Sequence, residues 1–187
     1  MEARHLLAMV FVMSSPAQAT FLDCLGFDGF DGEAVAAPAQ WRGNLTVHNC
    51  ARRSVLPVAA TPLRPLTWST SLAATAQALA NQCVYAHSGT AGLGENIAAA
   101  APQSDRSTAS AQDWASEFAF YNHAANSCTA GQQCGHYTQM VWSTTTQVGC
   151  GMAQCSVNSP FAGPNFQQWT LVFCNYSPAG NNGSRPY

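Results

Sequence analysis

The chain has 187 residues, of which only 9% are charged, and its formal net charge is −2 at pH 7. This length suits one domain of ordinary size with a single core. All seven basic residues are arginines, and so sparse a charge argues against nucleic-acid binding, which requires a basic surface.

Residues 1–19 have the pattern of a secretory signal peptide. Arg4 and His5 precede an apolar run, residues 6–13, and Ala17-Gln18-Ala19 forms a small-x-small cleavage site. The alternative is an apolar tail with no targeting role. The run is too short to cross a bilayer as a helix, and no later run approaches twenty apolar residues. We therefore expect a soluble mature chain without a transmembrane segment.

Eight cysteines, an even number, indicate export to an oxidising compartment. Only Cys150 and Cys155 come near the spacing of a zinc knuckle, and no second pair matches it. Disulfides are therefore favoured over zinc. The cysteines are Cys24, Cys50, Cys83, Cys128, Cys134, Cys150, Cys155 and Cys174.

The first half of the chain predicts an extension followed by two helices. Residues 20–43 are loop-like, and their acidic residues lack EF-hand spacing. A first helix over residues 44–55 must end before Pro57. After a proline-rich connector, a second helix covers residues 69–83, with Ser69 or Thr70 as its N-cap. Its apolar stripe consists of Leu72, Ala76, Leu79 and Cys83.

Residues 84–109 read as polar loops, and a third helix is predicted over residues 109–121. That helix carries Glu117 on or beside its apolar face, together with Trp114, Phe118 and Tyr121. An unpaired carboxylate is costly there, so Glu117 needs a partner or a wet cleft.

Strands are predicted in the last third of the chain. Residues 136–143 alternate, with His136, Thr138, Met140 and Trp142 on one side, and we expect a central strand there. Further strands are expected at residues 148–153 and 169–176, separated by a loop over residues 156–168. Helices followed by strands indicate an α+β layered domain.

Several motifs along the chain resemble those of the CAP superfamily. That family groups cysteine-rich secretory proteins, antigen 5 and plant pathogenesis-related proteins of the first class. Gly135-His136-Tyr137-Thr138-Gln139-Met140-Val141-Trp142 is similar to its first signature, and Phe173-Cys174-Asn175-Tyr176-Ser177-Pro178-Ala179-Gly180-Asn181 to its second. Shorter motifs follow in the family's order: His48-Asn49 with Ala51-Arg52, Pro65-Leu66-Thr67-Trp68, Ala80-Asn81-Gln82-Cys83, Gly94-Glu95-Asn96-Ile97 and Trp114-Ala115-Ser116-Glu117.

The resemblance covers residues 44–187 and identifies them as one CAP (SCP) domain. It implies a three-layer α-β-α sandwich, which agrees with the α+β reading. It also implies three disulfides, Cys83–Cys155, Cys128–Cys134 and Cys150–Cys174. Cys24 and Cys50 are then left over, and we pair them with each other.

The family's cleft tetrad falls on His87, Glu95, Glu117 and His136. Two imidazoles and two carboxylates suit zinc or a similar divalent ion. They also suit acid–base chemistry, or a polar network that only rigidifies the cleft. No metalloprotease motif is present, no cysteine is spare as a nucleophile, and Ser88 lacks a nucleophile-elbow context.

Phe161, Phe166 and Trp169 fit one form of the caveolin-binding aromatic spacing. In sterol-binding members of the family, a loop near this place is implicated in sterol capture. The alternative is that Trp169 is core and the two phenylalanines pin a long loop. Two large apolar residues between glycine and proline could line a lipid-sized pocket.

We therefore expect a secreted, extracellular, monomeric protein that binds a small hydrophobic ligand, a sterol or fatty acid, and is not a conventional enzyme. The resemblance suggests a role in defence, export or host interaction. Two alternatives stay open. One is a metal-dependent or serine-type extracellular hydrolase, a protease, and the other is a protein-interaction module.

Overall fold

The computed structural model describes residues 36–187, so the expected signal peptide, most of the extension and Cys24 lie outside the described residues. The helices, in chain order, are α3 (Arg42–Arg53), α4 (Thr70–Ala80), α5 (Ala109–Ser116) and α6 (Gly135–Met140). The strands are β1 (Thr67–Trp68), β2 (Gly94–Ala100), β3 (Tyr121–Asn122), β4 (Ser127–Cys128), β5 (Gln147–Cys155) and β6 (Trp169–Ser177). The short 3-10 helices are η1 (Ala39–Trp41), η2 (Glu117–Phe120) and η3 (Pro164–Phe166).

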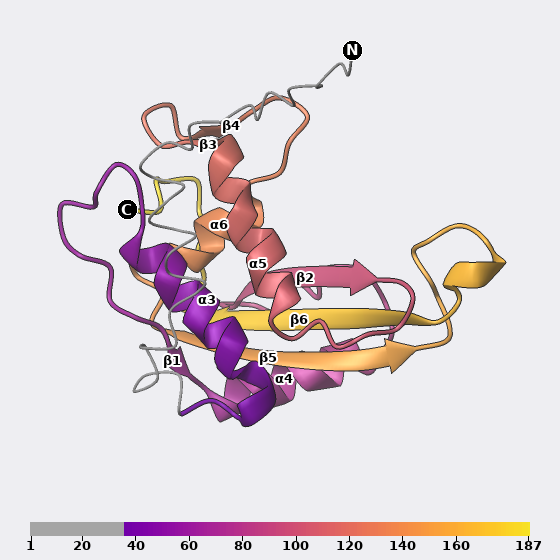
Figure 1. Cartoon of the computed structure of the whole chain (residues 1–187). Helices are drawn as coiled ribbons and strands as arrows, with labels where there is room; N and C mark the ends of the chain where they lie inside the picture. The colour runs from indigo at the N-terminus through magenta and orange to yellow at the C-terminus, as the bar shows by residue number, and fades with distance from the viewer. Residues whose placement is uncertain (1–35) are drawn as a thin grey trace, which may run out of the picture.

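The centre of the fold is a mixed sheet with strand order β1-β5-β6-β2. β1 runs parallel to β5, whereas β5, β6 and β2 are antiparallel neighbours. Helix α4 packs on one face of the sheet, and α3, α5 and α6 lie on the other side (Figure 1). This arrangement confirms the α+β, three-layer α-β-α prediction.

Helix α4 approaches the sheet very closely because the strand below it carries glycines. A Cβ atom built on Gly149 would lie 2.3 Å from the backbone nitrogen of Ala73, and one on Gly151 would lie 2.3 Å from that of Gln77. Ser69 caps the helix as predicted, since its hydroxyl accepts the Leu72 N–H at 3.3 Å. Leu72, Ala76 and Ala80 are buried, and Leu79 and Cys83 of the predicted stripe are partly buried against the same core.

On the opposite face, α3 delivers a buried guanidinium to the end of α6. Arg52 is 1% exposed and donates only to backbone carbonyls in the hydrogen bonds described. Its Nη1 donates to the carbonyls of Met140 and Trp142 at 2.9 and 2.8 Å. Because the last carbonyls of a helix have no intrahelical partner, Arg52 fixes where α6 stops.

The three disulfides implied by the family resemblance are present: Cys83–Cys155, Cys128–Cys134 and Cys150–Cys174. Cys150 and Cys174 are directly opposite each other on β5 and β6, so this bond lies within the sheet. Cys50 is also disulfide-bonded. Its expected partner, Cys24, lies outside the described residues, so that pairing stays a prediction.

The predicted central strand at residues 136–143 is wrong, because this stretch forms α6. Tyr137 and Met140 are buried together on one side of that helix, and a three-residue spacing fits a helix as well as the alternation fits a strand. What decides between them is distant in sequence. Glu117 accepts N–H groups at the start of α6, and Arg52 binds carbonyls at its end.

Strand β2 was missed, since residues 84–109 were expected to be loops. Its sequence, Gly-Glu-Asn-Ile-Ala-Ala-Ala, has few large apolar residues, and among the described strands it pairs with β6 alone, at the edge of the sheet. The third helix ends at Ser116 and continues as η2, so it is shorter than predicted. The first helix and the strands at residues 148–153 and 169–176 are confirmed, each within a few residues.

Candidate functional site

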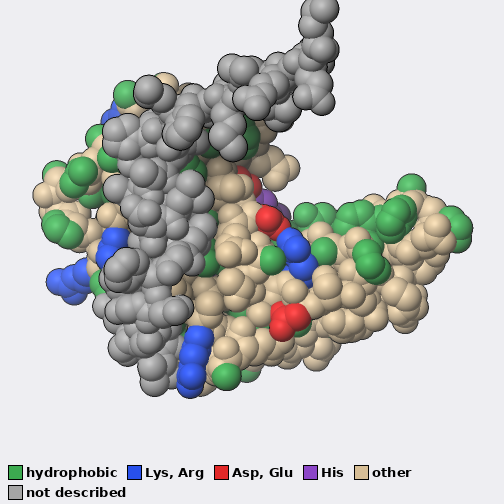
Figure 2. All heavy atoms as spheres, viewed as in Figure 1, with side chains coloured by type: hydrophobic (Ala, Val, Ile, Leu, Met, Phe, Trp, Pro, Cys, Tyr) green, Lys and Arg blue, Asp and Glu red, His purple; other side chains and the backbone are tan. Residues whose placement is uncertain are grey.

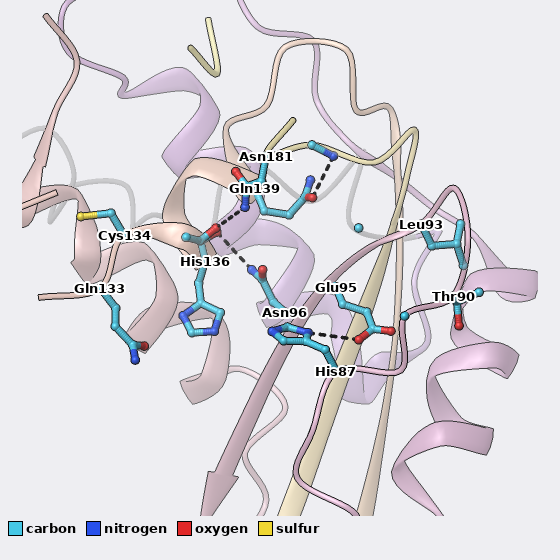
Figure 3. Close-up of a pocket in the computed structure, with 14 residues that line it drawn as sticks. His87, Thr90, Leu93, Glu95, Asn96, Gln133, Cys134, His136, Gln139 and Asn181 are labelled. Carbon is cyan, nitrogen blue, oxygen red and sulfur yellow. Dashed lines mark hydrogen bonds and ion pairs between the residues drawn. The ribbon is translucent and has the colours of Figure 1, made fainter. Parts of the chain in front are cut away.

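A cavity of about 510 Å³ opens where the start of β2 meets α6 (Figure 3). Four parts of the chain form its walls. The loop before β2 contributes His87, the strand contributes Glu95 and Asn96, and the first turn of α6 contributes His136. The segment after β6 closes it with Gly180 and Asn181. Sequence positions almost a hundred residues apart therefore share one pocket.

The first pair in this pocket is His136 with Glu117. Nδ1 of His136 lies 2.6 Å from Oε1 of Glu117. The carboxylate does not itself line the cavity but lies behind the imidazole, at the junction of α5 and η2. The indole of Trp114 stacks on the imidazole with ring centroids 5.8 Å apart. His136 is thus fixed in orientation by a carboxylate and a neighbouring ring.

The second pair is His87 with Glu95. Nδ1 of His87 lies 3.1 Å from Oε1 of Glu95, while the histidine side chain is 61% exposed. Glu95 also accepts the backbone N–H and the hydroxyl of Ser88. The hydroxyl of Ser88 hydrogen-bonds to Thr90 and Glu95, and within the described residues no hydrogen bond joins it to a histidine. A serine–histidine catalytic pair is therefore not formed.

All four tetrad residues are brought together, but as two pairs. Within residues 36–187, no group of three or more His, Cys, Asp or Glu side chains is arranged to hold a metal ion. Each histidine uses Nδ1 for its glutamate, so Nε2 is left as the ring nitrogen that faces other partners. Carboxylates that hold the far nitrogen of a histidine are typical neighbours of metal-binding imidazoles.

A buried chain of hydrogen bonds reaches the pocket from α3, and sequence reasoning missed it. Burial lowers the pKa of His48 to about 4, so this ring is neutral. Its Nδ1–H donates to the carbonyl of Asn44 at 2.8 Å, which leaves Nε2 to accept from the hydroxyl of Tyr176 at 2.7 Å. Asn96 then donates from Nδ2 to the oxygen of Tyr176 at 3.0 Å and to the carbonyl of His136 at 3.1 Å.

Asn96 therefore ties the sheet to the first turn of α6. It is 1% exposed, and its amide points toward the His136 carbonyl in Figure 3. The only sequence signal for this role was the position of Asn96 beside Glu95 in the Gly-Glu-Asn-Ile motif. The motif gives no hint of the partner residues, which lie about forty and eighty positions further along the chain.

The three aromatic residues expected to bind a hydrophobic ligand do not share one surface. Trp169 is fully buried, and its indole N–H donates to the carbonyl of Val157 at 2.8 Å. It belongs to the core beneath the loop. Phe161 and Phe166 lie above it with ring centroids 6.4 Å apart, and Phe166 is 42% exposed. Only the two phenylalanines are placed to meet a ligand from solvent.

Among residues 36–187, none of the helices combines the length and the apolar character needed to cross a membrane.

The profile of the family described as "CAP: Cysteine-rich secretory protein family" matches residues 45–176. The chain is 41% identical over 143 residues to peptidase inhibitor 16 of Bos taurus. The matched region covers 75% of this chain but only 30% of that protein. It is 39% identical over 148 residues to pathogenesis-related leaf protein 4 of Solanum lycopersicum, covering 76% of this chain and 80% of that protein.

Solved structures show the same architecture. Venom allergen-like protein 4 of Schistosoma mansoni matches with a TM-score of 0.62 and 27% identity, covering 81% of this chain and 95% of that one. The crystal structure of NaASP2 with Zn²⁺ also gives a TM-score of 0.62, with 26% identity, covering 81% of this chain and 87% of that one. Both support the description of helices packed around a mixed four-stranded sheet.

Proposed function

Because the chain belongs to the cysteine-rich secretory protein (CAP) family, we propose that it is an exported protein whose cleft binds zinc or a similar divalent ion through His87 and His136. The family and the disulfides are consistent with secretion. The observation that carries the metal proposal is the pairing of both histidines, through Nδ1, with a glutamate. In this proposal Glu95 and Glu117 orient the ligands instead of binding the ion.

The donor set fits such an ion. Neutral imidazoles are common zinc ligands, and a carboxylate on the far nitrogen fixes the tautomer and raises the basicity of the ring. Two protein ligands leave the remaining coordination positions to water or to a ligand in the pocket. We therefore expect weaker binding than at a structural site with four protein ligands.

The test is a calorimetric titration of the metal-free secreted protein with zinc chloride. His87→Ala and His136→Ala should each weaken binding by about tenfold or more, since each removes one ligand. His123→Ala is the matched control, because this histidine contacts the carbonyl of Tyr187 and does not line the cavity. Unchanged affinity in both pocket variants would contradict the proposal.

A second candidate function is binding of a small hydrophobic ligand, a sterol or fatty acid, at Phe161 and Phe166. The specific support is their mutual contact and the exposure of Phe166 on a loop held over the core. Phe161→Ala with Phe166→Ala should weaken binding of a labelled sterol without changing the thermal midpoint. Phe120→Ala, at another exposed aromatic residue, is the control. Sterol binding that survives in the double variant would exclude this loop.

A hydrolase has less support, because Ser88 contacts Glu95 and Thr90 and no metalloprotease motif is present. A protein-interaction module would require a binding partner protein.

We further infer a leader at residues 1–19, an extension at 20–43 and the CAP domain at 44–187, acting as a monomer. N-terminal sequencing of the secreted protein tests the first boundary, and light scattering tests the monomer.

A further inference from the structure

Four exposed hydrophobic side chains lie on the two chain segments that the Cys83–Cys155 disulfide joins. Val84 and Tyr85 directly follow Cys83 and are 47% and 44% exposed. Val157 comes two positions after Cys155 and is 56% exposed, and Phe166 lies further along the same loop. We call these four residues the apolar tip. The disulfide keeps the starts of the two segments together where β5 ends, so the four exposed side chains belong to the same part of the molecule.

The two chain segments that carry the tip contain no charged residue. Residues 65–94 and 118–184 contain no Asp, Glu, Lys or Arg. Figure 2 shows hydrophobic side chains along the arm that projects to the right, where the loop after β5 is drawn in Figure 1, with no charged side chain over its outer part. A partner selected by charge is therefore not favoured for this surface.

Three backbone carbonyls at or beside the tip are already hydrogen-bonded, which matters for any apolar environment. Unpaired carbonyls are costly outside water. The indole of Trp169 donates to the carbonyl of Val157, the hydroxyl of Ser159 donates to that of Phe166 at 2.6 Å, and Gln103 Nε2 donates to that of Cys155 at 3.0 Å. The loop can leave water without exposing these groups.

We propose that the apolar tip docks on an uncharged lipid bilayer by inserting its side chains shallowly into the headgroup region. A second copy of the chain is a poorer occupant, since stable protein interfaces take about 20–30 residues from each side. A bilayer needs no matching shape, and aromatic side chains are favoured at its interface. The proposal shares Phe166 with the hydrophobic-ligand loop but does not depend on ligand binding.

The test is co-sedimentation of the full secreted protein with phosphatidylcholine vesicles, at low and at high salt. We expect binding that salt does not weaken, because the surface is uncharged. Val84→Ser with Tyr85→Ser should lower the partition coefficient by about tenfold. These residues lie outside the ligand loop, so binding of a water-soluble sterol analogue should stay unchanged in this variant. Loss of sterol binding without loss of docking would contradict the proposal, because it would assign Val84 and Tyr85 to ligand binding and not to docking.

Leu56→Ser with Val58→Ser is the matched control, because it removes two exposed hydrophobic residues, 50% and 82% exposed, from outside the tip. Near-ultraviolet circular dichroism verifies folding, and Val157→Ser with Phe166→Ser repeats the test if the first variant is unstable. The proposal is overturned by equal losses in tip and control variants, by binding only to anionic vesicles and only at low salt, or by no vesicle binding at all. Concentration-dependent dimers that the tip variants abolish would make a second copy the occupant.

Discussion

Glu117 and His136 are joined in two ways. One carboxylate oxygen lies 2.6 Å from Nδ1 of the imidazole, and the other accepts the backbone N–H of the same histidine at 3.0 Å. It also accepts the N–H of Tyr137 at 3.1 Å. These N–H groups lie in the first turn of α6 and have no intrahelical partner. A single carboxylate therefore orients the imidazole and caps the helix that carries it.

Replacing Glu117 separates these two roles. Glu117→Ala should lower the free energy of unfolding by about 1–3 kcal/mol, because it leaves two N–H groups unpaired. It should also weaken zinc binding by about 10–100-fold, because the imidazole loses its orienting carboxylate. Glu117→Gln keeps an acceptor for the helix but not the charge, so we expect most of the stability to return and most of the metal affinity to stay lost. Urea unfolding and zinc titration measure the two effects, and a glutamine variant that matches the wild type in both would contradict this assignment.

The fold could be predicted where one segment contains its own signal. The alternation of residues 169–176 and the hydroxyl of Ser69 are local features, and both appear in the structure. Helix α6 could not be predicted from its alternation, because its start depends on Glu117 and its end on Arg52, 19 and 88 positions away. β2 carries mostly small residues, so its pairing with β6 had no local signature.

The site shows the same division. The four residues of the tetrad could be named from their motifs, because a motif marks residue type and position. Their grouping into two pairs could not, since it depends on which ring nitrogen faces which carboxylate. Asn96 was missed because a buried amide has no distinctive spacing, and its partners come from two other elements, α6 and β6.

No other cationic side chain should be able to replace the arginine at position 52. Its Nε donates to the carbonyl of Arg64 at 2.6 Å, and its two terminal nitrogens reach the carbonyls of Met140, Trp142 and Thr145. Burial lowers its pKa to about 10, so it stays protonated at neutral pH. A lysine ammonium cannot span these carbonyls. We expect Arg52→Lys to lower the free energy of unfolding by about 2–3 kcal/mol.

Arg106→Lys is the control for that experiment, since Arg106 pairs with Asp113 at the surface, where such pairs contribute about 0–1 kcal/mol. Denaturant unfolding of both variants gives the comparison. Similar midpoints for the two variants would show that the guanidinium geometry of Arg52 is not needed.

Alanine substitutions should affect stability differently at a glycine below α4 and at a glycine of the cleft. Gly151→Ala would place a Cβ atom 2.3 Å from the backbone of Gln77, so the helix must move. We expect a loss of about 1–3 kcal/mol, which for a domain of this size shifts the thermal midpoint by several degrees. Gly135→Ala meets nothing within 4 Å and should be neutral or slightly stabilising. Equal midpoints for the two alanine variants would mean that the sheet accommodates the extra carbon.

The buried imidazole of His48 should make stability depend on pH. Its pKa is about 4 in the folded protein and 6.5 in an unfolded chain, so the unfolded state binds more protons between these values. Stability is therefore fully present above about pH 6.5 and falls as the pH drops toward 4, by about 1.4 kcal/mol per unit and about 3 kcal/mol in total. Carboxylates titrate in the same range, so the contribution of His48 has to be isolated by comparison with a variant.

His48→Gln supplies that comparison, because glutamine can donate to one neighbour and accept from another but does not titrate. At pH 7 the variant should be less stable, since the amide cannot match the fixed geometry between Asn44 and Tyr176. As the pH falls toward 4, only the wild type must bury a group that prefers to be protonated. The difference in free energy of unfolding between the two proteins should therefore shrink, and urea titrations at several pH values measure it. Parallel stability curves would show that His48 binds a proton as readily in the folded protein as in the unfolded chain.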